Sequence, residues 1–298
     1  MENKLIAIVG PTASGKTDLA KALYRKFSGV VISVDSRQIY QKLDIGTGKD
    51  KSFLQEMIDI VSPEENFSVV RFQQKVLKTI DKVFLRGKVP FLVGGTGFYL
   101  DSVIFQREYP QVAPNEKLRS QYNKKTIAEL FGILKTKDVE SAKRTGKNKR
   151  RLIRALEIIE QTGKTIPIFQ NNSLRFPSLI LGIKIDSELL YQRIDERVDE
   201  RIKDGMIAEV RDLIQSGVSR TWLKNLGLEY RFITEYLEAK TTRDKMIQQL
   251  KFAIHGYARR QMTWWRRYPN IKWFELKNFT KQEIHREAEK LVKQFLNI

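Results

Sequence analysis

The sequence predicts an α/β protein with a parallel sheet of the P-loop NTPase type and an inserted, mainly helical domain. Three observations indicate this fold. The glycine-rich stretch GPTASGKT at residues 10–17 lies between a strand-like and a helix-like segment. Apolar runs alternate with amphipathic helical patterns up to residue 105, which is typical of a parallel α/β sheet. A basic, helix-rich stretch at 107–177 separates this region from the next apolar run.

The 298 residues are therefore expected to form two domains. The α/β core comprises residues 1–106 and 178–298 and includes a series of C-terminal helices. The insert comprises residues 107–177.

The first half of the core alternates strands and helices. The expected strands, each a short apolar run, are 4–9, 30–34, 57–61 and 89–93. One helix is expected at 16–27 and a second after Ser68, where apolar residues recur at spacings of three and four. Ser68 is a typical N-cap residue, and Gly87 ends this second helix.

The second half of the core is mostly helical. The apolar run 179–185 returns to strand character, and 271–276 indicates a short last strand. The expected helices are 188–205, 206–216, 228–239, 243–265 and 281–296.

Ligands of parallel sheets bind beyond the carboxyl ends of the strands, where 10–17, 35–40 and 94–99 are expected. In the first loop, glycines let backbone N–H groups approach phosphate oxygens, and the next helix adds a favourable dipole. Lys16 supplies a charge to terminal phosphates, and the Thr17 hydroxyl is placed for Mg²⁺. The expected diphosphate-binding residues are Gly10, Thr12, Ala13, Ser14, Gly15, Lys16 and Thr17.

Asp35 follows the second strand, and three roles fit it equally. It could hold Mg²⁺ through water, act as a general base, or cap a turn. In VGGTG, Gly94 and Gly95 allow close approach of a ligand and Thr96 offers a hydroxyl, although a tight turn explains the same residues.

The charge of the chain indicates a polyanionic partner. The net charge is +19, and it is concentrated in two segments, 107–177 and 251–279. The first has 16 Lys and Arg against 7 Asp and Glu, and the second has 7 against 1. An even spread would suit general solubility, so this distribution favours a nucleic-acid surface.

The second basic segment interleaves arginines with aromatic residues, in YARRQMTWWRRYPNIKW. Arginines contact phosphates, and aromatic rings stack on unpaired bases, so an RNA contact is favoured over a Trp core face with a basic exterior. The RNA-contact residues expected here are Arg259, Arg260, Trp264 and Arg266. His255 and His285 show no ligand spacing and are interpreted as structural.

Another arginine pattern lies in RIDERVDERIKDG. Arg193, Arg197 and Arg201 share one helical face with interleaved acids. A solvated, salt-bridged face is the ordinary reading; the alternative is one arginine turned inward towards a phosphate leaving group.

Several classes are excluded or disfavoured. No cysteine is present, which excludes disulfides, thiolate nucleophiles and Cys-ligated zinc and fits a reducing cytoplasm. No apolar run is long enough to span a membrane, and the N-terminus lacks the features of a signal peptide. We expect a cytoplasmic monomer.

The motifs together resemble the bacterial-type tRNA dimethylallyltransferases, also called tRNA isopentenyltransferases. The resemblance covers nearly the whole chain. It rests on GPTASGKT, DSRQIYQKLDIGTG, VGGTGFYL, RLIRALEI, RIDERVDERIKDGMIAEV and YARRQMTWWRR, in the order and spacing of the family.

The resemblance implies that dimethylallyl diphosphate donates its five-carbon group to N6 of the adenosine 3′ of the anticodon in tRNA. Diphosphate leaves with the help of Mg²⁺, and the adenosine is flipped into a channel. By motif, Asp35 matches the general base, Arg197 the arginine at the departing diphosphate, and Thr96 a residue near the adenosine. The segments matching tRNA contacts contribute Asp35, Ser36, Arg37, Gln38, Thr96, Arg150, Arg151 and Arg154. The insert resembles the family's tRNA-gripping domain.

The chain departs from the family pattern at two places. Residues 147–151 read KNKRR where many members have Asn-Asp-Pro-Gln-Arg, and 226–230 read LGLEY in place of Ile-Gly-Tyr-Lys-Glu. We expect no site role for 226–230. The alternative functions are an ATP-dependent P-loop kinase acting on a nucleotide or RNA, a non-catalytic RNA-binding protein, and an enzyme that prenylates free adenine nucleotides.

Overall fold

A computed structural model describes residues 3–167 and 173–298. The chain divides into two compact units, one formed by the segments up to Phe105 and from Leu174 onwards, the other by Gln106–Ser173. The second segment of the core therefore begins a few residues earlier than the expected 178. Leu174 pairs with Phe105, and the Arg175 N–H donates to the Ile104 carbonyl over 2.7 Å, which ties this stretch to the core.

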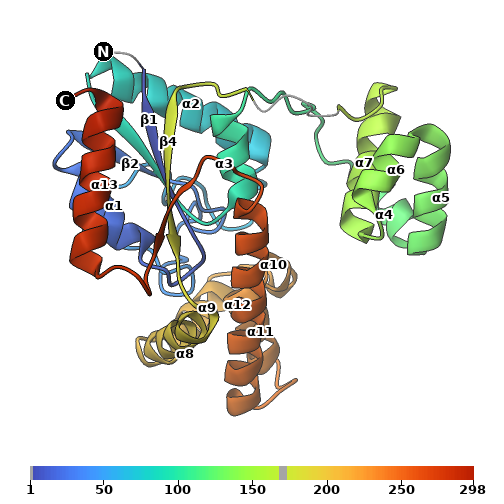
Figure 1. The fold of residues 1–298 in the computed structure, drawn as a ribbon. Coiled ribbons are helices and arrows are strands. Elements are labelled where there is room, and N and C mark those ends of the chain that lie inside the picture. The colour runs from blue at the N-terminus through green and yellow to red at the C-terminus, as the bar shows by residue number, and fades with distance from the viewer. Residues whose placement is uncertain (1–2, 168–172) are drawn as a thin grey trace. The chain divides into compact units, whose positions relative to one another are not determined.

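The core contains a five-stranded parallel sheet in the order β2-β3-β1-β4-β5. The strands are β1 (Leu5–Val9), β2 (Gly29–Ser33), β3 (Val89–Val93), β4 (Ser178–Lys184) and β5 (Lys272–Glu275). The predicted α/β class with a parallel sheet is confirmed. Figure 1 shows the strands and the helices that cover them.

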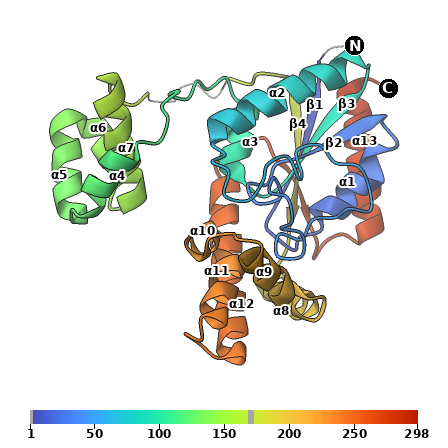
Figure 2. The ribbon, with the colours of Figure 1, turned by 180° about the vertical axis from the view of Figure 1, so that it is seen from behind.

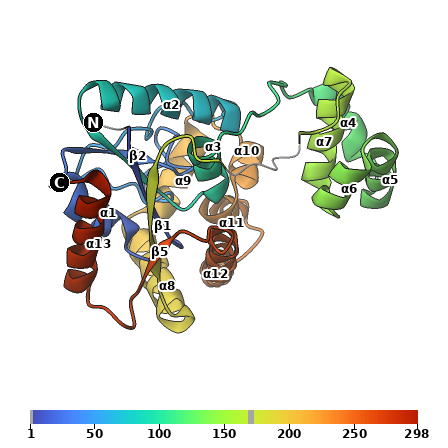
Figure 3. The same cartoon turned by 45° about the horizontal axis from the view of Figure 1, so that its top comes forward.

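Side chains alternate between the two faces of the sheet. In β1, Leu5 and Ala7 join the buried cluster of one face, while Ile6 and Ile8 join that of the other. Helices α1 (Lys16–Tyr24) and α13 (Lys281–Leu296) cover the second of these faces (Figures 1 and 3). Helices α2 (Val69–Leu85) and α3 (Gly97–Ile104) lie over the first (Figure 2). As predicted, the Ser68 hydroxyl caps α2 by accepting the Arg71 N–H.

The remaining helices of the core pack against one another near the carboxyl ends of the strands. They are α8 (Ser187–Lys203), α9 (Met206–Gln215), α10 (Arg220–Leu226), α11 (Leu228–Leu237) and α12 (Arg243–Trp265). Helices α3 and α10 have no counterpart among the expected elements.

The strand expected at 57–61 is wrong. Only isolated bridges form there, Ile32 with Glu56 and Tyr40 with Val61. Met57 and Asp59 have φ of 68° and 54°, in the left-handed region that a regular strand excludes.

The inserted unit contains α4 (Glu116–Asn123), α5 (Ile127–Lys137), α6 (Val139–Thr145) and α7 (Lys149–Thr162) around an apolar core of its own. The Glu157 carboxylate is fully buried and accepts hydrogen bonds from Asn115, Arg119 and Arg154. The described residues of the insert are therefore mainly helical.

Candidate active site

A cavity of about 700 Å³ lies at the carboxyl ends of β1, β2 and β3, where the three predicted ligand loops meet. It brings together half of the site residues expected from the sequence. Those that line it are Thr12, Ala13, Lys16, Thr17, Asp35, Ser36, Arg37, Gln38, Arg197 and Arg260. The sequence therefore places the main groups correctly, although they come from segments up to 248 positions apart.

The phosphate loop has the backbone that its glycines allow. Gly10 has φ of 148°, and a Cβ there would lie 2.7 Å from the Ile183 carbonyl oxygen, so only glycine fits. Gly15 has φ of 92° at the start of α1. The Ser14 hydroxyl is buried beneath the loop and forms no hydrogen bond. The expected phosphate contact of Ser14 is through its backbone N–H, which donates to the Pro11 carbonyl over 3.4 Å in this structure, and the contact stays a prediction.

Lys16 lies against the loop and donates from Nζ to the Pro11 carbonyl over 2.5 Å. Burial and the neighbouring Arg197 guanidinium lower the pKa of Lys16 to about 7, although the Asp35 carboxylate opposes this shift. The empty site therefore holds a lysine that is close to losing its proton at neutral pH.

This pKa predicts a pH-dependent affinity for pyrophosphate. A bound anion favours protonated Lys16, so at pH 8 binding must return a proton to it, and affinity falls as pH rises through 7. Calorimetry at pH 8 in buffers of different ionisation enthalpy should show greater proton uptake for the wild type than for Lys16→Met. Equal uptake by the two proteins would contradict the lowered pKa.

Asp35 lies on the same side of the cavity. Its Oδ1 accepts the Arg37 N–H over 2.8 Å, and Oδ2 has no hydrogen bond within the described parts of the chain. The Thr96 hydroxyl accepts the Ser36 N–H over 3.3 Å, so Thr96 borders this turn without lining the cavity. Burial and the Asp35 carboxylate raise the pKa of Tyr257 to about 12, which keeps a neutral phenol beside the acid. The open Oδ2 leaves Asp35 able to accept a proton.

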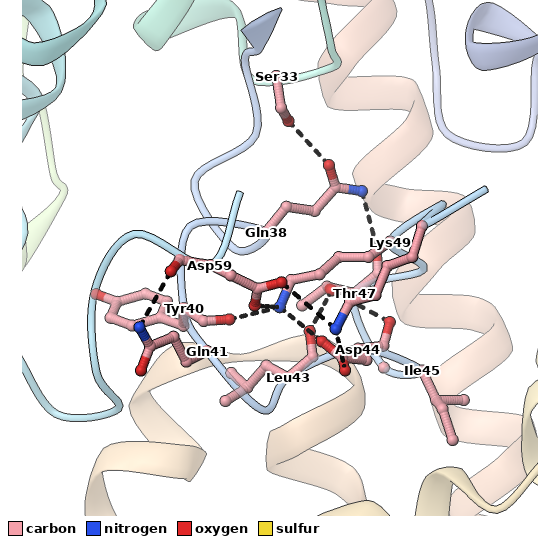
Figure 4. Close-up of polar contacts among 12 residues, drawn as sticks. Ser33, Gln38, Tyr40, Gln41, Leu43, Asp44, Ile45, Thr47, Lys49 and Asp59 are labelled. Atoms are coloured by element: carbon pink, nitrogen blue, oxygen red, sulfur yellow. Dashed lines mark hydrogen bonds and ion pairs between the residues drawn. The ribbon is translucent and has the colours of Figure 1, made fainter. Parts of the chain in front are cut away.

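Gln38 acts as a scaffold residue. Its Oε1 accepts the Ser33 hydroxyl, and its Nε2 donates to the carbonyls of Thr47 and Gly48 (Figure 4). The amide thus holds neighbouring backbone in place, and its expected contact with tRNA stays a prediction.

The loop at 44–50 is held by two residues that the sequence analysis missed. The fully buried Lys49 ammonium donates to the Tyr40 carbonyl over 2.6 Å, and to Asp44 and Asp59 over 2.8 Å and 2.6 Å (Figure 4). The Glu209 carboxylate accepts the backbone N–H groups of residues 44–46. These contacts fix the wall of the cavity that Gly46, Thr47 and Gly48 form.

Arg197 is the inward-facing arginine of the repeated pattern on α8. It lines the cavity, is half-buried, and forms no hydrogen bond or ion pair within the described residues. Because the carboxylates near this half-buried cation, Glu229 and Asp35, form no ion pair with it, a bound anion would be stabilised there. The ordinary reading of this pattern, a wholly solvated and salt-bridged face, is therefore wrong for this helix.

Helix α12 joins the loops that follow β1 and β3. The Gln261 amide accepts the Thr12 N–H over 2.8 Å and donates to the Gly95 carbonyl over 3.0 Å. A Cβ on Gly95 would lie 2.1 Å from that amide nitrogen, which explains the glycine. Sequence reasoning missed Gln261, because nothing local marks a partner 249 positions away.

The arginine–aromatic segment is only partly open to a ligand. Arg259, Arg260 and Arg266 are exposed, and Arg259 donates to the Tyr191 hydroxyl. Trp264 is half-buried: its indole N–H donates to Asp101, Arg267 lies 3.8 Å over its ring, and Gly97 lies against its edge. The indole therefore has a packing role, and its expected contact with RNA stays a prediction. His255 pairs with Asp195, as expected of a structural residue.

In the inserted unit, Arg150 and Arg151 are exposed at the start of α7. Arg154 instead pairs with Glu157 and donates to the Val112 carbonyl over 2.7 Å. The guanidinium therefore helps to hold the unit together, and its expected tRNA contact stays a prediction.

Two features are absent from residues 3–167 and 173–298, a side-chain metal site and a membrane-spanning helix. No three His, Cys, Asp or Glu side chains form a group that could hold a metal ion alone. No helix there is long and apolar enough to cross a membrane.

The fold and site define a P-loop α/β protein with a cationic cavity at the carboxyl ends of its strands. Family models for IPP transferase and isopentenyl transferase match residues 38–268 and 3–58. The chain belongs to the IPP transferase family.

Curated relatives agree with this assignment. The tRNA dimethylallyltransferase of Acetivibrio thermocellus is 37% identical over 297 residues, covering 95% of each chain. That of Alkaliphilus oremlandii is 37% identical and covers 99% of this chain and 98% of its own.

Solved structures are also similar. The tRNA isopentenylpyrophosphate transferase of Bacillus halodurans has a TM-score of 0.75 at 33% identity, covering 99% of this chain and 97% of its own. A eukaryotic dimethylallyltransferase, described as acting on tRNA, has a TM-score of 0.84 at 25% identity, covering 99% of this chain and 79% of its own.

Proposed function

We propose that this chain is a tRNA dimethylallyltransferase that transfers the dimethylallyl group of dimethylallyl diphosphate to N6 of the adenosine 3′ of the anticodon. One observation carries the proposal: Asp35, Lys16 and Arg197 converge in a single cavity of a chain whose relatives have this name. The cavity thus offers one base and two cations.

The reaction follows from these groups. N6 attacks the first carbon of the donor, and the carbon–oxygen bond to the diphosphate breaks with its electron pair passing to the bridging oxygen. Lys16, Arg197 and the loop N–H groups stabilise this growing negative charge. Oδ2 of Asp35 accepts the proton that N6 loses, and diphosphate leaves.

Mg²⁺ is the proposed cofactor. Thr17 lines the cavity, and the hydroxyl that ends a phosphate loop of this pattern is a usual Mg²⁺ ligand beside the substrate phosphates. The residues present therefore fit an ion held at Thr17 by the donor's own oxygens. When bound, Mg²⁺ would neutralise charge on the diphosphate.

The proposed partner is the anticodon stem-loop of tRNA, bound by a monomer in the cytoplasm. The open cations Arg150, Arg151, Arg259, Arg260 and Arg266 support an RNA surface. An acceptor no larger than a nucleotide would not need basic segments of this extent.

Mass spectrometry tests the activity. tRNA incubated with the protein, dimethylallyl diphosphate and Mg²⁺ should gain one dimethylallyl group on the expected adenosine. A parallel incubation with γ-labelled ATP tests the kinase alternative. Phosphoryl transfer without any prenylated tRNA would overturn the proposal.

The basic surface predicts a steep salt dependence. Neutralising several phosphates releases counterions, so tRNA affinity should fall about 10³-fold or more between 50 and 200 mM salt if six or more contacts form. Fluorescence anisotropy with labelled tRNA measures this slope. A flat dependence would show that the basic segments are not the interface.

A further inference from the structure

Arg201 is a second arginine of the cavity that the proposed mechanism leaves unused. It lies on α8 one turn beyond Arg197 and lines the same cavity. Only 13% of its side chain is exposed. An arginine is seldom this buried unless an anion pairs with it.

The two guanidinium groups approach the same point of the backbone. A Cβ on Gly48 would lie 1.7 Å from Nη2 of Arg201 and 2.5 Å from Nη2 of Arg197. Gly48, with φ of 60°, therefore makes room for two like charges side by side. Burial and the charge of Arg201 lower the pKa of Arg197 to about 10, which reflects this proximity.

Glu229 is the carboxylate that faces Arg201. Its side chain is 14% exposed, and its Oε1 lies 3.5 Å from Nη1 of Arg201. The same Nη1 donates to the Gly46 carbonyl over 3.2 Å. Glu229 lies in the stretch 226–230 for which the sequence indicated no site role, yet it lines the cavity.

The charges in the cavity are unevenly compensated. Arg201 has Glu229, whereas Arg197 has no ion pair among the described residues. A diphosphate can accept two guanidinium groups at once, because each presents a planar set of donors to phosphate oxygens.

We propose that Arg201 is a second arginine that binds the diphosphate, and that Glu229 is its counter-ion while no anion is bound. This inference rests on the proposed function, in which the anion is the diphosphate of the prenyl donor. Arg201 would turn part of its donor set from Glu229 to the phosphate oxygens. Glu229 thus competes with the diphosphate for the same cation.

The test compares binding of inorganic pyrophosphate by calorimetry. Arg201→Gln should weaken binding about tenfold, because one charge-assisted contact is lost. Arg193→Gln is the matched control, since Arg193 shares the helical face but does not line the cavity, and it should bind as the wild type does. Unchanged binding by Arg201→Gln would overturn the proposal.

Glu229→Gln supplies a second test, because a damaged fold would weaken pyrophosphate binding and could not strengthen it. It removes the competing charge with little change of shape, so pyrophosphate should bind several-fold more tightly. Weaker or unchanged binding would contradict the role of counter-ion. Arg201→Lys keeps a charge but loses the planar fork, and its affinity should fall between those of the wild type and Arg201→Gln.

Two further measurements separate this inference from its alternatives. If Arg201→Gln weakened binding of tRNA and left that of pyrophosphate unchanged, Arg201 would serve an RNA phosphate and the proposal would be wrong. Prenyl transfer by the wild type tests the proposed function by itself. If the protein bound pyrophosphate through Arg201 but prenylated no tRNA, the inferred role of Arg201 in anion binding would stand. Only the proposed function would then be wrong.

Discussion

Replacing Asp35 with asparagine should slow prenyl transfer by about 10²- to 10⁴-fold, the range typical of a lost general base. The amide keeps the size of the side chain and can still accept the Arg37 N–H, so the turn should remain intact. It cannot accept a proton from N6. Single-turnover rates with enzyme in excess over tRNA isolate this step from product release.

Asp50→Asn is the matched control for this substitution. Asp50 also lines the cavity, but its carboxylate already pairs with Lys21 over 2.5 Å. We expect it to retain most of the rate. The affinity of Asp35→Asn for tRNA should stay close to that of the wild type, and a near-normal rate for that variant would remove the general-base role.

Much of the fold could be predicted because its signals are local. The strand β1 is a run of five fully buried apolar residues, and the phosphate loop follows it directly. Ser68 begins α2 as expected, because a cap requires only groups three positions apart. The wrong strand at 57–61 shows where local signals fail. Its apolar residues suit a strand, but they are equally compatible with the left-handed backbone observed at Met57.

The site could be predicted only in part. Lys16 and Asp35 were found because each follows a strand, and parallel strands end at a common edge. Gln261, Glu209 and Glu229 were missed because their partners lie far away in the sequence. Trp264 and Arg154 also have packing roles that composition does not reveal, since Asp101 and Glu157 bind them.

Arg197→Gln is the second substitution with a large expected effect. Its guanidinium forms no hydrogen bond or ion pair in the described chain, so the substitution breaks none. The variant should therefore melt at the same temperature as the wild type. Removing one donor from a site of developing charge typically costs about 10²- to 10³-fold in rate. The same single-turnover assay measures this loss, with Arg193→Gln as the control on the same helical face.

The substitution at Arg197 also has a consequence away from the reacting atoms. Arg197 is one of the two causes that lower the pKa of Lys16 to about 7. Without it, the pKa of Lys16 should rise, although burial, the larger cause, still holds it below its ordinary value. Pyrophosphate binding by Arg197→Gln should then take up fewer protons at pH 8 than binding by the wild type. A slower rate with unchanged proton uptake would mean that Arg197 acts on the diphosphate but does not govern the charge of Lys16.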